Sequence, residues 1–179
     1  NISSTISNEM QRDAFISVVI SAICMLIYIA IRFKDVKFGS SAIIALINDV
    51  LVVFAAYSVG RLSVGGTFIA CMLTIIGYSI NSTIVIFDRI RENLKLQTIR
   101  TRDDIKALVN QSISSTLVRT INTSLTTFVM VLALFICGVS SLREFALALM
   151  VGVIGGAFSS VFLTGPLWYM MKTRIGSDV

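Results

Sequence analysis

The sequence predicts an all-α membrane protein, a polytopic bundle of five transmembrane helices. Hydrophobic residues make up 55% of the chain and charged residues only 14%, whereas a soluble domain carries about 25% charged residues. The mean hydropathy is +0.87, and a single proline leaves little room for a flexible linker. Helices are the economical way to cross lipid, because each backbone N–H and C=O finds its partner within one segment.

Five apolar segments are each close to the ~20 residues that a helix needs to cross ~30 Å of hydrocarbon. The expected spans are Ala14–Ile31, Ser41–Tyr57, Thr67–Phe87, Ile121–Cys137 and Phe145–Met171. The last span is long, so we expect it to tilt or to extend beyond the bilayer. The first is not expected to be a signal peptide, because acidic and polar residues precede it and no small-residue cleavage site follows.

The basic residues gather at one end of these spans. Eleven of the 15 fall on one side: Arg32, Lys34, Lys37, Arg89, Arg91, Lys95, Arg100, Arg102, Lys106, Lys172 and Arg174. Three fall on the other side, Arg12, Arg61 and Arg143, and Arg119 lies at the entrance of the fourth span. Basic loops favour the cytoplasm, so the N-terminus is expected to be extracytoplasmic and the C-terminus cytoplasmic. Because the positive charge follows membrane topology, no nucleic-acid partner is expected.

This orientation divides the chain into five parts. Residues 1–13 form an extracytoplasmic lead-in, 14–87 hold three spans, 88–118 form a cytoplasmic connection, 119–172 hold two spans, and 173–179 form a cytoplasmic tail. Within the connection, Ile105, Leu108, Val109, Ser112 and Ile113 recur at helical spacing, and Thr101 with Asp104 resembles a capping box. We expect an amphipathic helix there that either rests on lipid head groups or contacts a partner.

A carboxylate lies deep in the second span. Asn48 and Asp49 are midway along it, so Asp49 is roughly 13 Å from either boundary at 1.5 Å per residue. A charged and unpaired carboxylate at such a depth costs at least ~2.5–3.5 kcal/mol. Asp49 is therefore either a protonated acid that is hydrogen-bonded to a neighbouring helix, or a group that takes part in ion or proton movement.

Two polar stripes occupy the cytoplasmic halves of the third and fourth spans. The first consists of Thr74, Tyr78, Asn81 and Ser82, with Thr83 beside it, and the second of Arg119, Asn122, Thr123 and Thr126. Their similar depth predicts that they face each other. Taken singly, Ser82, Thr83 and Thr126 could instead bond carbonyls of their own helix. Arg119 stays charged and needs a carboxylate, carbonyls or water.

Small residues repeat every four positions in the last span, at Ala148, Gly152, Gly156 and Ser160. Residues with this spacing line one face of a helix and let another backbone approach closely. We therefore expect a tight helix–helix contact along this face.

Three motifs resemble those of SecF, the subunit that works beside SecD on the Sec translocon. Residues 77–93 (Gly-Tyr-Ser-Ile-Asn-Ser-Thr-Ile-Val-Ile-Phe-Asp-Arg-Ile-Arg-Glu-Asn) match its signature at nearly every position, except that Ser82 stands where the family usually carries Asp. Residues 119–127 are similar to its second signature, and Leu46–Val50 resembles its Leu-Leu-His-Asp-Val segment. The resemblance covers nearly the whole chain. It implies the second to sixth spans of SecF, an RND-like half that starts where a periplasmic domain ends, or the SecF half of a fused SecDF.

The resemblance also implies a function. SecF is described as part of an ion-driven, RND-related motor that pulls preproteins out, so the implied partners are a SecD-like subunit or half, the SecY/SecE/SecG channel, unfolded preproteins and the bilayer. Its proton path pairs the Asp of the signature with the Arg of the fourth span. Here Arg119 is present, but Ser82 does not titrate near neutral pH. The partner half could carry the acid, Asp49 could replace it, or the site could bind sodium through Asn81, Ser82 and Thr83.

The leading hypothesis is an accessory subunit of protein export in a bacterial or archaeal cytoplasmic membrane that, with SecD, uses an ion gradient. One alternative is a non-conducting assembly subunit of the same complex, and another is a fragment of an RND-class small-molecule transporter. An enzyme is not expected, because the chain has no histidine, no activated nucleophile and no cofactor loop. No cofactor and no metal site are expected, apart from a transported proton or sodium ion.

Overall fold

The computed structural model describes residues 2–33, 36–62, 65–97 and 101–175, and these contain helices and no strand. The elements are α1 (Ile2–Phe33), α2 (Val36–Gly60), α3 (Gly66–Leu96), α4 (Arg102–Cys137), α5 (Ser140–Ser159), the π-helical segment η1 (Ser160–Thr164) and α6 (Gly165–Ile175). The prediction of an all-α bundle is confirmed.

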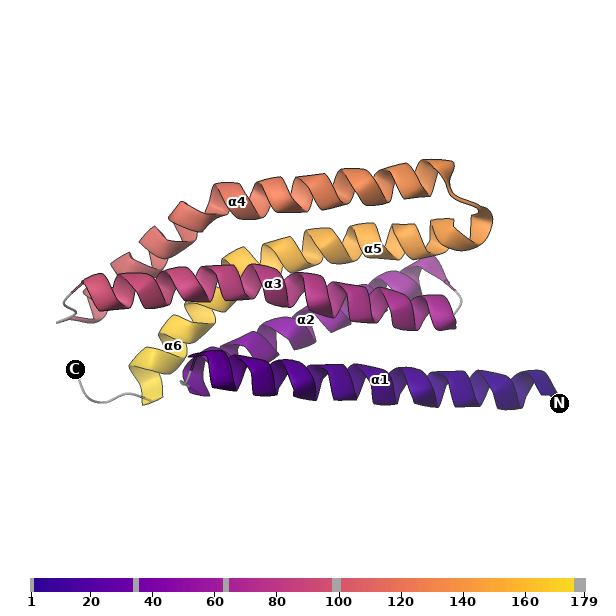
Figure 1. Ribbon diagram of the computed structural model, residues 1–179, viewed down its shortest axis with the longest axis horizontal. Coiled ribbons are helices and arrows are strands. Elements are labelled where there is room, and N and C mark those ends of the chain that lie inside the picture. The colour runs from indigo at the N-terminus through magenta and orange to yellow at the C-terminus, as the bar shows by residue number, and fades with distance from the viewer. Residues whose placement is uncertain (1, 34–35, 63–64, 98–100, 176–179) are drawn as a thin grey trace.

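Four helical stretches are long and apolar enough to cross a membrane. They are Lys37–Gly60, Gly66–Leu96, Arg102–Cys137 and Leu142–Thr173, and α1 adds a shorter apolar stretch at Val19–Ile29. The chain is therefore a multi-pass membrane protein. In Figure 1 the long helices lie roughly along one direction, with α4 at one side of the bundle and α1 at the other. Helices α3 and α5 form the centre, because each contacts both α2 and α4.

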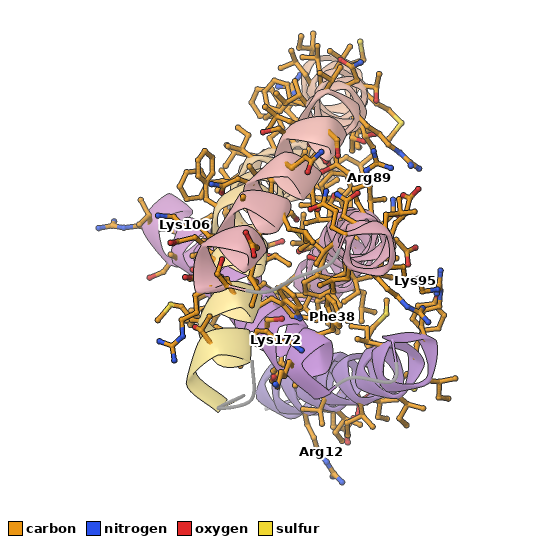
Figure 2. The ribbon with its side chains drawn as sticks, turned by 90° about the vertical axis from the view of Figure 1, so that its left-hand side faces the viewer. Arg12, Phe38, Arg89, Lys95, Lys106 and Lys172 are labelled. Carbon is orange, nitrogen blue, oxygen red and sulfur yellow. The ribbon has the colours of Figure 1, made fainter. Side chains whose placement is uncertain are left out.

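The buried side chains form two clusters along the bundle axis. One surrounds Val53, Met72 and Ile75 near the α2–α3 connection. The other lies at the opposite end, where the ring of Phe38 packs 4.9 Å from that of Phe87 and 5.0 Å from that of Trp168. Figure 2 looks onto this second end and shows Phe38 in the interior. Aromatic pairs at these separations are favourable contacts.

The connection expected at residues 88–118 is divided between two long helices. Helix α3 continues to Leu96, and α4 begins at Arg102 and runs unbroken into the fourth span. The capping box is confirmed, since the backbone N–H of Asp104 donates to Thr101 Oγ1 (3.3 Å) and that of Thr101 donates to Asp104 Oδ2 (2.8 Å). The amphipathic face, which includes buried Ile105 and Leu108, packs on the bundle itself. It thus covers the chain's own core, a placement that neither of the two expected alternatives included.

The last span, expected over Phe145–Met171, is present at Leu142–Thr173 and is bent. Five residues with π-helical geometry, Ser160–Thr164, separate α5 from α6, and Figure 1 shows α6 leaving the direction of α5. Two local causes are visible: Pro166 has no N–H to continue the helical ladder, and the hydroxyl of Thr164 donates to the carbonyl of Ser159 (3.5 Å). Proline and π-bulges are the usual origins of sharp kinks.

The small residues of α5 lie where helices approach closely. A Cβ added to Gly152 would lie 2.3 Å from Ile75 Cδ1 on α3 and 3.1 Å from Val53 Cγ2 on α2. A Cβ on Gly156 would lie 3.6 Å from Ser79 Cβ, and Ser160 is fully buried. A side chain at position 152 would thus force Ile75 to move, whereas Gly156 has room for a methyl group at ordinary contact distance.

Candidate functional site

Asp49 lies in the centre of the bundle, between α2, α3 and α5. Its side chain is 1% exposed. The hydroxyl of Ser79 on α3 donates to Asp49 Oδ2, and the side chains of Ser159 and Asn48 lie near the same carboxyl. Asp49 Oδ1 is also buried but has no hydrogen-bond partner among the described residues. The carboxyl group is therefore held on one side only.

Layers of buried side chains lie on both sides of Asp49 along the bundle axis and close the site at both ends. One turn toward the α2–α3 connection, Val53, Ile75 and Gly152 pack together. Toward the other end, buried Thr83 and Thr164 follow, and the cluster of Phe38, Phe87 and Trp168 closes the column. Ser159 joins α5 to α2 directly, because its Oγ donates to the carbonyl of Ala45 (3.4 Å). The result is a polar core that is shielded from lipid.

A second polar region lies between α3 and α4 and is open. A cavity of about 530 Å³ is lined by Val85, Asp88, Arg89, Glu92, Ser115, Thr116 and Arg119. Within it, Arg89 Nε donates to Ser115 Oγ (3.1 Å) and Arg89 Nη1 pairs with Glu92 Oε2 (2.7 Å). Figure 2 shows Arg89 between the two helices. The guanidinium of Arg119 is exposed and has no ion pair among the residues described.

A smaller cavity of about 280 Å³ adjoins this region and shares Asp88 and Glu92 with it. Here Nη2 of Arg32, at the end of α1, lies 3.0 Å from Asp88 Oδ1 and 3.1 Å from Asp88 Oδ2. The guanidinium of Arg91 donates to the backbone carbonyl of Arg32 (3.2 Å), which closes the C-terminal end of α1. These contacts, which we call the α1 clasp, fasten α1 to α3.

The two predicted polar stripes do not face each other as expected. On α4, the side chains of Arg119, Asn122, Thr123 and Thr126 are all exposed. On α3, Ser82 and Thr83 are buried, whereas Asn81 is exposed. The hydroxyl of Thr123 donates to the carbonyl of Arg119 and that of Thr126 donates to the carbonyl of Thr123, so both groups are satisfied within their own helix.

A second line of polar residues on α4 repeats every four positions, at Ser112, Thr116, Thr120 and Ser124, and of these only Ser112 was expected on a packing face. Two of the four hydrogen-bond to side chains of α3. Tyr78 donates to Ser124 Oγ (2.7 Å), and Asn93 Nδ2 donates to Ser112 Oγ (2.8 Å). The i, i+4 spacing of these four residues could have indicated a buried face. The neighbouring stripe that contains Arg119 also has helical spacing and carries a charge, so it was the face expected to meet α3.

An apolar groove of about 560 Å³ runs between α4, α5 and η1 and was not predicted. Phe128, Phe158 and Phe162 are among its lining side chains, and the rings of Phe158 and Phe162 stack with centroids 4.6 Å apart. It has few polar atoms, so it offers no chemistry of its own.

The motifs and the bundle agree with the comparisons to known proteins. Residues 1–174 match the family described as protein export membrane protein SecD/SecF, C-terminal. The chain belongs to this family. The resemblance of the three motifs to SecF is thus confirmed.

Individual SecF and SecDF proteins are similar over almost all of the chain. The SecF subunit of the protein translocase from Alicyclobacillus acidocaldarius is 44% identical over 169 residues, which is 94% of this chain and 54% of that protein. The SecDF subunit from Bacillus subtilis is 42% identical, over 97% of this chain and 23% of that protein. A crystal structure of SecDF from Thermus thermophilus, described as a translocon-associated membrane protein, matches with a TM-score of 0.84 and 44% identity, covering 92% of this chain and 22% of that one. The chain therefore spans about half the length of the SecF relatives it matches.

Proposed function

We propose that the chain is the membrane part of an accessory subunit of the Sec machinery that, together with a SecD-like half, uses an ion gradient to promote preprotein export. The observation that carries the proposal is the exposed stripe of Arg119, Asn122, Thr123 and Thr126 on α4. A cation and three polar side chains on the outside of an apolar helix are costly in lipid, and such residues in membrane proteins usually face a bundle interior or a water-filled path. A second half that covers this stripe would place Arg119 inside the assembly.

Two further features support the proposal. The family includes fused SecDF chains such as those of Bacillus subtilis and Thermus thermophilus, in which a SecD-like half belongs to the same polypeptide. The orientation drawn from the basic residues puts the Arg119 cavity at the cytoplasmic end of the spans. The SecY/SecE/SecG channel and unfolded preproteins are the partners that this function requires.

Replacement of Arg119 tests the proposal. In the full-length native protein, Arg119→Leu should abolish the stimulation of preprotein secretion, because leucine keeps the side-chain bulk and removes the only charge of the stripe. The measurement is the secreted fraction of a preprotein in cells whose sole copy carries the variant, with membrane levels checked by immunoblot. Lys106→Leu on the same helix is the matched control, since Lys106 is exposed and points away from the bundle (Figure 2). Normal secretion in the Arg119→Leu strain would reject a central role for Arg119.

One observation favours a second function, that of a non-conducting assembly subunit. Ser82 occupies the position at which SecF usually carries an acid, so this chain lacks that titrating group. Co-purification distinguishes the two functions. If Arg119→Leu protein still purifies with a SecD homologue and the channel while secretion falls, ion coupling is supported. If the variant loses its partners and secretion falls in proportion, the assembly function is supported.

A further inference from the structure

Asp49 Oδ1 lies in the closed core of the bundle. It is buried and has no hydrogen-bond partner among the residues that the structure describes, while its sister oxygen accepts from Ser79. Buried polar atoms in native proteins almost always have a partner, and an exception calls for an explanation such as a bound ion or water. Something other than this chain's described side chains is therefore expected to satisfy Oδ1.

The polar side chains around the Asp49 carboxyl all offer oxygen atoms as ligands. Ser79 on α3 and Ser159 on α5 supply hydroxyl groups and Asn48 on α2 supplies an amide. A hydroxyl has two acceptor lone pairs, so Ser79 can donate to Oδ2 and still offer an oxygen to a cation. Each of the three helices that surround the carboxyl thus contributes at least one oxygen-bearing side chain. Neutral oxygens around a single carboxylate suit a hard cation of low charge.

The backbone beside this site is irregular. The π-helical segment η1 begins at Ser160, directly after Ser159. π-Bulges in helices occur frequently at functional sites, and interrupted helices near the bilayer midplane form the sodium sites of many transporters. In the same place, α5 lies close to α3, since a Cβ on Gly156 would be 3.6 Å from Ser79 Cβ. The interruption of α5 therefore coincides with the unpartnered carboxylate oxygen.

The net charge of the site limits which cation it can bind. No charged side chain among the described residues faces the carboxyl, whose polar neighbours are Asn48, Ser79 and Ser159. A single carboxylate is balanced by one positive charge, whereas calcium takes six to eight oxygen ligands. We propose that Asp49, Ser79 and Ser159 form a binding site for one sodium ion in the α2–α3–α5 core. The site lies about half a turn around α3 from the Arg119 cavity, and it does not involve Ser82.

The biological role of this site rests on the proposed ion-coupled function, but its test measures sodium binding and not secretion. If sodium does not bind, the secretion experiment with Arg119→Leu is unaffected, and if that experiment fails, the binding measurement still decides whether the site exists. The protein used is the purified full-length native protein with its partner half. Two quantities are measured: equilibrium binding of radioactive sodium, and the thermal denaturation midpoint in sodium chloride against choline chloride at equal ionic strength. A ligand that binds only the folded state raises the midpoint in proportion to its occupancy.

We expect saturable sodium binding and a sodium-dependent rise of the midpoint in the wild type. Asp49→Asn should remove both, because the amide keeps the shape but not the charge. Ser79→Ala and Ser159→Ala should each raise the Kd for sodium about ten-fold, which corresponds to about 1.4 kcal/mol. Asp13→Asn and Thr74→Ala are the matched controls, since both residues are exposed, and they should bind sodium like the wild type.

Circular dichroism and elution volume show whether each variant is folded, and Ser159→Ala keeps the test decisive if Asp49→Asn fails to fold. Sodium binding that survives in Asp49→Asn overturns the proposal. The proposal is also overturned if the denaturation midpoint of the wild type does not depend on sodium but depends on pH, and if Asp49→Asn removes this pH dependence. The carboxyl would then bind only a proton.

Discussion

The Asp49 core and the Arg119 cavity share helix α3 but differ in almost every physical respect. Ser79 and Asp88, which belong to the two regions, are nine residues apart, so at 3.6 residues per turn they lie about half a turn from each other around α3. The Asp49 core is closed by apolar layers from three helices of this chain. The Arg119 cavity is open, and its charged side chains are 40% exposed or more in both ion pairs.

This difference shows which region the chain completes by itself. Around Asp49, the helices α2, α3 and α5 pack closely, and Gly152 lies at one of these close contacts. We therefore expect this region to hold the bundle together. Around Arg119, the described residues leave the cavity open, and the polar stripe of α4 is exposed beside it. Substitutions should therefore affect folding in the first region and assembly or transport in the second.

The largest effect on stability is expected from Gly152→Val. The new Cβ would lie 2.3 Å from Ile75 Cδ1 and 2.6 Å from Ile75 Cγ1, and overpacking of a core costs about 1–3 kcal/mol. The denaturation midpoint of the purified protein should fall clearly. Gly39→Val on α2 is the control, because a Cβ there meets nothing within 4 Å. Equal midpoints for the two variants would contradict the claim that the Asp49 core holds the bundle together.

An intermediate effect is expected from Tyr78→Phe, at the boundary between the two regions. The change removes the hydrogen bond from Tyr78 to Ser124, which joins α3 to α4, and a typical intramolecular hydrogen bond contributes about 0.5–1.5 kcal/mol. Chemical denaturation should detect the loss. Tyr28→Phe, at an exposed position on α1, should be almost silent. If both variants are equally stable, Tyr78 does not join the two regions.

The smallest effect on stability is expected from Asp88→Asn in the α1 clasp. Asp88 and Arg32 are each about 40% exposed, and exposed ion pairs contribute about 0–1 kcal/mol. The loss should be measurable in dilute buffer and should vanish at high salt, because ions screen exposed charges. Asp13→Asn serves for comparison. A large loss that persists in high salt would mean that the open region contributes to the fold as strongly as the closed one.

Much of the fold follows from patterns that act within one helix. The apolar segments predict the spans, and Thr101 with Asp104 predicts the start of α4, because a capping box needs only residues three positions apart. The four-residue repeat of small side chains placed the face of α5 that meets α3, since close approach requires the absence of a Cβ.

Features that depend on contacts between helices were harder to predict. Helix α4 carries two adjacent polar stripes, and hydroxyl groups that bond their own helix, such as those of Thr123 and Ser124, do not reveal which stripe faces inward. The pairing of Asp49 with Ser79 joins residues 30 positions apart, so no local pattern announces it. The bend at Ser160–Thr164 had one local signal, the following Gly165-Pro166, but proline alone does not specify a π-helical turn.

The α1 clasp also has a consequence for biogenesis. Arg32 precedes its ion-pair partner Asp88 by 56 residues, and its backbone carbonyl precedes Arg91 by 59. Because ribosomes add about 5–20 residues per second, roughly 3–11 s pass between the synthesis of the two halves of the ion pair. During this interval the C-terminal end of α1 lacks these two polar contacts with α3. The ion pair can thus fasten α1 to α3 only after α3 has been synthesised.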